Sequence, residues 1–206
     1  MLAALVLNAV MAVATPASGV GAASAAEPRA ATSTNAASIP ATPQFRRYGV
    51  ADGVPSGSIY AVAQDRHGLM WFGADGGLVR YDGLAFKVFR HVPGDPLSLP
   101  SNQIYTLFVD RANRIWAGGV SAGLIVYDQA SGRFRHWEHD AKDPHSLSNN
   151  EVWSIAQTPD GQLWVATQGG LDRRRADGNG FDQVPLDVGT THAASFGPTR
   201  ALLYDR

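Results

Sequence analysis

The most regular feature of the chain is a segment of alternating hydrophobic and polar residues that occurs three times. Each copy opens on an aliphatic residue and carries a Trp twelve positions later. The copies span 59–72, 104–117 and 152–165, so the Trp recurs at intervals of 45 and then 48 residues. Short alternating runs indicate β-strands, and a period in this range indicates a repeated structural unit.

Each copy extends into four short hydrophobic runs that are separated by Gly, Asp and Asn. Such residues form the tight turns of antiparallel hairpins, so we predict four strands per copy. The predicted strands are 59–65, 69–74, 77–82 and 85–91 in the first copy, 104–110, 114–117, 123–128 and 133–137 in the second, and 152–158, 162–166, 170–174 and 180–184 in the third. The third copy has Arg174-Arg175 where the other two have Tyr-Asp, which we interpret as an exposed edge of the sheet.

Four antiparallel strands in a repeat of about 40 to 50 residues, with a recurrent aromatic residue, are typical of a β-propeller blade. We therefore predict an all-β protein, a β-propeller of four-stranded antiparallel blades. A β-sandwich is the alternative, but its strands need not recur as near-identical quartets. The blades are expected at about 53–91, 99–137 and 147–184, within a propeller region at 44–206, and a fourth blade begins at about 199.

Three blades and the start of a fourth make an incomplete ring, because propellers have about four to eight blades. We therefore expect the sequence to be the N-terminal part of a larger protein. Phe45 to Tyr48 resembles the fourth strand of a blade, and we predict that it completes the last blade and closes the ring. Since strand edges stay exposed, residues 27–206 alone are expected to unfold with poor cooperativity and to aggregate.

Residues 1–26 have the pattern of a secretory signal peptide, in which an apolar run at 2–13 is followed by small residues. The run is shorter than the roughly 20 residues that span a bilayer. No Lys or Arg precedes it, since the first basic residue is Arg29, and the position of the start codon stays open. We expect export to the periplasm or another extracytoplasmic space, followed by a flexible linker at 27–43. An Ala-rich leader without a targeting role is the alternative.

The overall composition narrows the classes of partner and chemistry. A formal net charge of −1 gives no electrostatic reason to expect binding to nucleic acid or to an anionic membrane surface. The chain has no Cys, which excludes disulfides, thiolate metal sites and cysteine nucleophiles. A hydrophobic content of 45% is sufficient for a packed core.

Several motifs together are similar to the repeats of one known family. These are Gly53-Val54-Pro55-Ser56, the segment from Trp71 to Leu78, Tyr81-Asp82-Gly83, and connectors at 94–102 and 142–150 that contain Asp-Pro-x-Ser-Leu. Over residues 44–184 the chain resembles the two component regulator propeller family. The resemblance implies the sensor region of a bacterial membrane receptor, which in full-length proteins precedes a transmembrane helix and a histidine kinase or diguanylate cyclase output domain.

The recurrent Trp residues admit a structural and a functional interpretation. Trp71, Trp116 and Trp164 are expected to pack between neighbouring blades, where Gly73 and Gly118 allow close approach. Stacking on a carbohydrate is the alternative for these side chains. The packing role is favoured because a large aromatic side chain in mid-strand, followed by a small residue, suits a blade interface.

The Asp-Pro-x-Ser-Leu connectors also admit two interpretations. Asp95 and Asp143 are expected to accept backbone hydrogen bonds in Asx-turns, and Leu99 and Leu147 to fill the space between blades. A calcium site is the alternative. Calcium needs several converging oxygen ligands, and the sequence has no D-x-D-x-D-G series to supply them.

No motif in the sequence assigns a catalytic residue, a cofactor-binding residue or a metal ligand. The six His residues show no H-x-x-x-H or H-E-x-x-H spacing, and no G-x-S-x-G segment places a nucleophile. Ligand contacts are expected instead in the loops that follow the Trp strands, at Asp75, Ser121 and Gln168, because these loops differ most among the copies.

Our leading hypothesis is an exported, non-catalytic sensor propeller of a bacterial signalling receptor. Its ligand is expected to be a small molecule, a glycan or a periplasmic protein, without a cofactor, and contact with the membrane would come only from downstream segments. A secreted propeller enzyme, such as a glycosidase or lyase, and a protein-interaction scaffold are the alternatives. The identity of the ligand, the output domain, the number of blades and homodimerisation of the full-length parent stay open.

Overall fold

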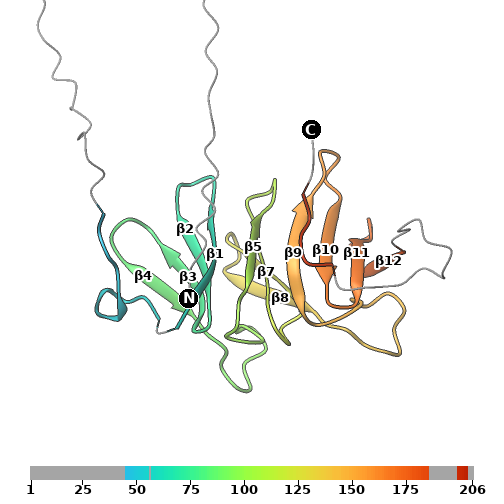
Figure 1. Cartoon of the computed structure of the whole chain (residues 1–206), viewed down its shortest axis with the longest axis horizontal. Helices are drawn as coiled ribbons and strands as arrows, with labels where there is room; N and C mark the ends of the chain where they lie inside the picture. Colours follow the sequence, from blue (N-terminus) through green and yellow to red (C-terminus); the bar gives the residue numbers. More distant parts are fainter. Residues whose placement is uncertain (1–44, 56, 186–198, 204–206) are drawn as a thin grey trace, which may run out of the picture. The chain divides into compact units, whose positions relative to one another are not determined.

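The computed structural model describes residues 45–55, 57–185 and 199–203, and the statements that follow concern these residues. They form three four-stranded antiparallel sheets, in each of which the strands pair in chain order (Figure 1). The only helix among them is a short 3-10 turn, η1 (Val50–Asp52), and none of the described chain could cross a membrane as a helix. The expected signal peptide and linker lie outside the described residues.

The strands follow the predicted quartets closely. The first sheet contains β1 (Ile59–Gln64), β2 (Met70–Ala74), β3 (Gly77–Tyr81) and β4 (Phe86–Phe89). The second sheet contains β5 (Thr106–Val109), β6 (Ile115–Gly118), β7 (Leu124–Asp128) and β8 (Arg133–Trp137). The third sheet contains β9 (Val152–Gln157), β10 (Leu163–Thr167), β11 (Gly170–Arg174) and β12 (Phe181–Val184). The predicted fold class, all-β with propeller blades of four antiparallel strands, is therefore confirmed.

One turn position in each blade has a left-handed backbone, which closes the first two strands into a hairpin. Gly68 (φ 83°), Asn113 (φ 61°) and Gly161 (φ 92°) occupy this position, three residues before the blade Trp. Gly and Asn tolerate positive φ better than other residues, so the turn residues fit the conformation that the hairpin requires.

Neighbouring sheets pack face to face, and β6 shows how one strand serves two interfaces. Ile115 and Ala117 are buried in a cluster with Trp71 of the first sheet. Trp116, which lies between them in the sequence, is buried in a cluster with Phe181 of the third sheet. Because successive side chains of a strand point to opposite faces, the central blade contributes to the core on both of its sides.

A buried Asp at the end of the first strand holds the Trp of the first two blades. Asp65 accepts the indole N–H of Trp71 at 2.9 Å, and Asp110 accepts that of Trp116 at 2.8 Å. Asp65 also accepts the backbone N–H groups two and four residues later, at 2.9 and 3.0 Å. Burial raises the pKa of Asp65, but these hydrogen bonds outweigh that effect and hold the pKa below its usual value.

The third blade lacks this contact. Thr158 stands where the other blades have the buried Asp, and Trp164 is only half-buried. Trp71 and Trp116, by contrast, are 0% and 1% exposed. The packing role expected for the three Trp residues therefore describes the first two better than the third.

Backbone hydrogen bonds join the first segments of consecutive blades, which contain β1, β5 and β9 and which we call the inner segments. The donor of each bond is the backbone N–H of the residue that opens a repeat. The acceptor is the backbone carbonyl that lies three residues after the Trp of the preceding repeat. The donor and acceptor pairs are Ile104 with Ala74, Val152 with Gly119, and Thr199 with Thr167, at 3.0, 3.1 and 3.0 Å. The last pair places residue 199 where a fourth repeat is expected to begin.

Small residues are required where these segments meet. A Cβ atom at Gly73 would lie 2.8 Å from the carbonyl oxygen of Ile104, and one at Gly118 would lie 2.5 Å from Cγ1 of Val152. Both distances are well inside the optimal separation of non-bonded atoms. The blades can therefore approach this closely only because Gly73 and Gly118 have no side chain.

The two blade connectors share one set of internal contacts. Asp95 and Asp143 each accept the N–H of the residue two positions later at 2.9 Å, which forms the expected Asx-turn. Leu99 and Leu147 are fully buried in the clusters between blades. The connectors are thus packed parts of the blade interfaces.

Two His residues complete the connectors, a role that was not predicted from the sequence. Nδ1 of His91 lies 2.7 Å from the carbonyl oxygen of Leu99, and Nδ1 of His139 lies 2.6 Å from that of Leu147. The backbone N–H of each His donates to the side chain of an Asn eleven residues later. The repeated His-to-Asn spacing was therefore a signal of this contact.

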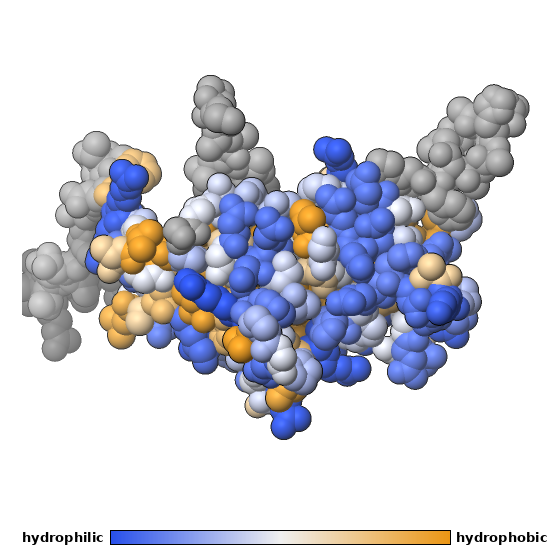
Figure 2. Space-filling view, turned by 90° about the horizontal axis from the view of Figure 1, so that it is seen from below, coloured by the Kyte–Doolittle hydropathy of each residue, from blue (hydrophilic) through white to orange (hydrophobic). Residues whose placement is uncertain are grey.

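The face of the first sheet that is turned away from the second sheet carries exposed hydrophobic side chains. Tyr48 packs there against Tyr81 and Phe86, with ring centroids 5.5 and 5.4 Å apart. Residues 45–48 are not in a strand, so the strand predicted to close the ring is not formed in the described chain. Figure 2 shows hydrophobic residues gathered over the part that holds this sheet, whereas polar residues cover most of the third sheet.

The third blade also places a buried carboxyl group in its interface with the second. Asp172 is 0% exposed and stands where β7 has Ile125. Its Oδ2 accepts the N–H and the hydroxyl of Ser148 at 3.1 and 2.7 Å, while Oδ1 is buried without a hydrogen-bond partner among the described residues. Burial raises the pKa of Asp172 and outweighs the opposing effect of the two hydrogen bonds.

Replacing Asp110 by Ala tests the contact between the buried Asp and the blade Trp. The change leaves the buried indole N–H of Trp116 without its acceptor, which costs about 1 to 3 kcal/mol, and it also removes the acceptor of two part-buried backbone N–H groups and of Arg114. We expect the free energy of unfolding, measured with urea, to fall by at least about 2 kcal/mol. Asp160→Ala, in an exposed turn, is the control and should change it by less than about 0.5 kcal/mol. Equal losses in both variants would contradict the role of Asp110.

Replacing Asp172 by Asn tests the effect of burying a carboxyl group. Its pKa in the folded state is raised above the ordinary value of 3.8, so the wild-type protein loses stability as the pH rises through the folded pKa. Asn is neutral at every pH. The variant should therefore gain stability relative to wild type as the pH increases from below 3.8. Thermal unfolding across this range measures the difference, and a difference that is constant with pH would contradict the raised pKa.

Candidate functional site

An aromatic side chain stands at the second position of the inner segment in each blade. Tyr60, Tyr105 and Trp153 hold this position, one residue after the aliphatic residue that opens each repeat. The ring centroids of Tyr60 and Tyr105 are 4.4 Å apart, and those of Tyr105 and Trp153 are 6.2 Å apart. We call these three residues the aromatic row, and it crosses all three blades.

The row follows from the way the inner segments are joined. β1, β5 and β9 are the edge strands at which consecutive sheets meet, and Ile104 and Val152 donate the backbone bonds that connect them. The side chains of Ile104 and Val152 are fully buried. Because successive side chains alternate, Tyr105 and Trp153 point away from that buried side, at equivalent places on neighbouring edges.

Two hairpin loops hold the ends of the aromatic row. The hydroxyl of Tyr60 donates to Oδ2 of Asp75 at 3.0 Å, and the indole N–H of Trp153 donates to Oε1 of Gln168 at 3.3 Å. Asp75 and Gln168 are two of the three loop residues expected to contact a ligand, and the structure brings both beside the aromatic rings. Ser121, the third, is exposed in the loop between β6 and β7 with φ 59°.

The aromatic row exposes ring surface to solvent, and it has a carboxylate beside one end and a guanidinium group beside the other. Tyr60 is 47% exposed, while Tyr105 and Trp153 are half-buried. The hydrogen bond to Asp75 raises the pKa of the Tyr60 hydroxyl above its usual value, because the carboxylate accepts from the protonated hydroxyl. Arg200, which occupies the corresponding position after the third blade, has its Cζ 5.4 Å from the ring centroid of Trp153 and adds a cation to the row.

This arrangement is suited to binding. Aromatic rings with polar tips can contact an apolar ring face and also exchange hydrogen bonds at its edge. Asp75 and Gln168 place acceptors at the two ends of the row, and Arg200 places a donor beside one of them. In the part of the chain that the structure describes, no group of three or more His, Asp or Glu side chains is placed to hold a metal ion.

No member of the aromatic row is among the site residues expected from the sequence. A signal was present, because Ile-Tyr, Ile-Tyr and Val-Trp pairs open the three repeats. Alternation alone does not distinguish a side chain that enters the next blade from one that stays accessible to solvent. The edge-to-edge placement of β1, β5 and β9 makes that distinction.

The chain is similar to proteins of bacterial signalling systems. An extracellular domain attributed to a hybrid two component system of B. thetaiotaomicron matches with a TM-score of 0.63 and 25% identity, over 68% of this chain and 20% of that chain. A histidine kinase of Formosa agariphila is 34% identical over 55 residues, which are 27% of this chain and 4% of the kinase. Virginiamycin B lyase from Staphylococcus aureus matches at a TM-score of 0.49 and 13% identity, over 68% of this chain and 44% of that chain. The chain thus spans only a small part of the signalling proteins that it matches.

The repeats themselves match one family. The sequence model of the two component regulator propeller matches residues 53–76, 98–121 and 146–169. Each match covers the first two strands of one blade, including the inner segment and the strand that carries the Trp. Matched repeats and observed blades therefore coincide, and the chain contains three segments that match the two component regulator propeller repeat.

Proposed function

We propose that the chain is a ligand-sensing, non-catalytic part of a propeller domain that lies outside the cytoplasm and belongs to a bacterial two component receptor. The similarity to an extracellular domain of a hybrid two component system supports this placement. The ligand binds along the aromatic row, and the output that it controls lies elsewhere in the full-length protein.

The aromatic row is the observation that carries the proposal. Each of the three blades contributes one ring, so a ligand that lies along the row contacts three separate sheets at once. A ligand shifts an equilibrium only through different affinities for the two states. Binding across three blades supplies such a difference, because it favours the blade arrangement in which the three rings are aligned.

A glycan is the class of ligand that fits this surface best. A sugar ring has apolar C–H faces that stack on aromatic rings, and hydroxyl groups at its edge that need hydrogen-bond partners. The row supplies rings at Tyr60, Tyr105 and Trp153, and the loops supply Asp75 and Gln168 as polar partners.

Replacing Tyr105 by Ala tests the proposal at the centre of the row. The change removes the ring that connects Tyr60 and Trp153, so one ligand can no longer stack along all three. We expect affinity for the oligosaccharide that binds wild type on an oligosaccharide array to fall about tenfold or more, which corresponds to about 1.4 kcal/mol. Titration followed by the fluorescence of the Trp residues measures the affinity.

The control variant is Phe45→Ala, which removes an aromatic side chain that is 93% exposed and distant from the row in the repeat pattern. Its affinity should equal that of wild type. Far-ultraviolet circular dichroism checks that both variants keep their strands. The proposed site is wrong if Tyr105→Ala binds as tightly as wild type, or if Phe45→Ala loses as much affinity.

A further inference from the structure

The interface between the second and third blades contains an Arg where the preceding interface contains a Tyr. In the pairing of strands, Tyr127 of β7 lies opposite Phe134, and Arg174 of β11 lies opposite Phe181. Tyr127 follows Trp116 by eleven residues and Arg174 follows Trp164 by ten, because the second blade has one more residue between its second and third strands. The prediction that Arg174 and Arg175 lie at an exposed edge of the sheet is therefore wrong for Arg174. Its side chain is half-buried against the second blade.

The two interfaces have closely similar geometry around this position. Tyr127 lies against a stacked pair formed by Trp71 and Phe89, with ring centroids 5.5 and 5.1 Å from its own. Arg174 lies over a stacked pair formed by Trp116 and Trp137, with its Cζ 5.4 and 5.2 Å from their centroids. A guanidinium group thus takes the place of a phenol ring.

The guanidinium group of Arg174 lacks the partners that a buried cation requires. Arg114 and Arg175, which flank it, each form an ion pair with an Asp, at 2.6 and 3.1 Å. Among the described residues Arg174 forms no ion pair, and its Nε is buried without a hydrogen-bond partner. Burial lowers the pKa of Arg174, and the charges of Arg114 and Arg135 lower it further.

Contact with the two Trp rings does not satisfy this group. The rings stabilise the positive charge, but an Arg side chain carries five N–H donors that need acceptors. The structure gives its terminal nitrogen one long bond, 3.4 Å to the carbonyl oxygen of Gly178. A buried donor without an acceptor destabilises the folded state, so an added acceptor would stabilise the site.

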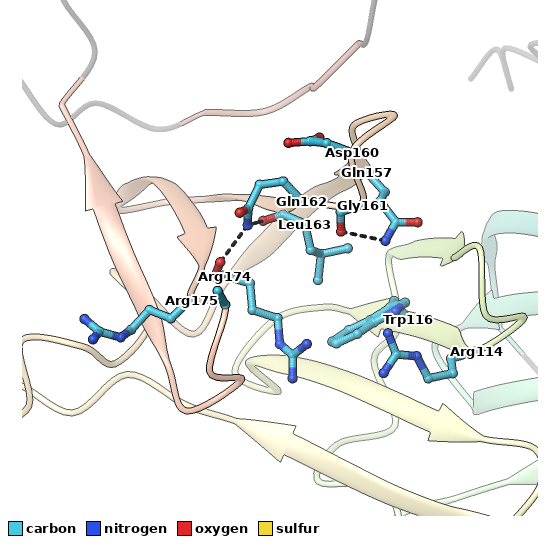
Figure 3. Close-up of a pocket in the computed structure, with 10 residues that line it drawn as sticks. Arg114, Trp116, Gln157, Asp160, Gly161, Gln162, Leu163, Arg174 and Arg175 are labelled. Atoms are coloured by element: carbon cyan, nitrogen blue, oxygen red, sulfur yellow. Dashed lines mark hydrogen bonds between the residues drawn. The ribbon is translucent and has the colours of Figure 1, made fainter.

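A pocket with room for such an acceptor opens beside Arg174. Its volume is about 240 Å³, and its lining includes Arg114, Trp116 and Gln162 (Figure 3). Figure 3 shows the guanidinium groups of Arg174 and Arg114 both lying toward Trp116, whereas the side chain of Arg175 points away. Two guanidinium groups therefore face one small pocket between the blades, together with the carboxylate of Asp160, and Arg174 is the one of the two that is not ion-paired, since Arg114 pairs with Asp110.

We propose that this pocket binds a small oxyanion, a carboxylate, sulfate or phosphate group, through Arg174 with support from Arg114. Arg pairs with oxyanions through parallel N–H donors in a fixed fork, so the anion supplies the acceptors that the protein lacks. The pocket is separate from the aromatic row. Arg174 ends β11, whereas Gln168 precedes the start of that strand, so the two sites lie at opposite ends of β11.

Calorimetric titration of the full chain at constant ionic strength tests the proposal. Inorganic sulfate and acetate are the anionic probes, and acetamide is the neutral one; none of the three presents a sugar ring to the aromatic row. We expect at least one anion to bind and acetamide to give no heat. Sulfate alone would identify a site for a free inorganic anion, whereas acetate alone would identify a site for a carboxylate; either result supports the oxyanion pocket.

Arg174→Tyr is the decisive variant, because it restores the residue that the second blade uses at this position. Its affinity for the bound anion should fall about tenfold or more. Arg174→Gln, which removes the charge at nearly constant length, should show the same loss and keeps the test valid if the Tyr side chain disturbs folding.

Arg173→Gln is the matched control, because it removes the same charge from the adjacent position, where the side chain faces the other side of β11 and contacts Asp182. This variant should bind the anion within about twofold of wild type, as expected for an exposed charge partly screened by salt. The proposal is overturned if neither anion binds wild type, or if Arg173→Gln weakens binding as much as Arg174→Tyr does.

Discussion

The close approach of consecutive inner strands is the constraint on which the rest of the structure depends. A backbone bond from Ile104 to Ala74 sets the spacing of the first two blades, and the missing side chain of Gly73 permits it. At this spacing the Trp of one blade enters the core formed with the next. The same spacing brings the ring centroids of Tyr60 and Tyr105 to 4.4 Å from each other. The close approach of the strands therefore determines both the packing of the blades and the candidate ligand surface.

One interface geometry accommodates different chemistry in different blades. Tyr127 completes an aromatic cluster between the first two blades, whereas Arg174 occupies the equivalent place between the second and third. Asp172 likewise replaces Ile125. Native interiors pair almost all buried polar groups, so two groups with unpaired atoms on one strand mark a local departure from the repeat. In repeat proteins such departures are where function can differ while the backbone stays the same.

The strands were predictable because every blade repeats the same physical requirements. Alternation identifies strands, Gly and Asn identify the hairpin turns, and the period of the Trp identifies the blade. The ends of the strands then agree within two residues. Residues 45–48 have the sequence pattern of a fourth strand but do not form one in the structure. A strand also needs a partner strand beside it, and the pattern of four residues does not specify that partner. Trp164 was predicted from its place in the repeat, but burial depends on which side chains cover it.

The sequence by itself determined the blade, its four strands, its turns and its Trp, because these follow from interactions between residues close in the chain. The ligand contacts expected from the sequence at Asp75, Ser121 and Gln168 stay a prediction. Only the tertiary structure decided that Tyr60, Tyr105 and Trp153 form a row, and that Arg174 lies inside an interface with an unpaired nitrogen. Residues about 45 positions apart meet only when blades pack, and a strand pattern does not specify which neighbour its side chains meet.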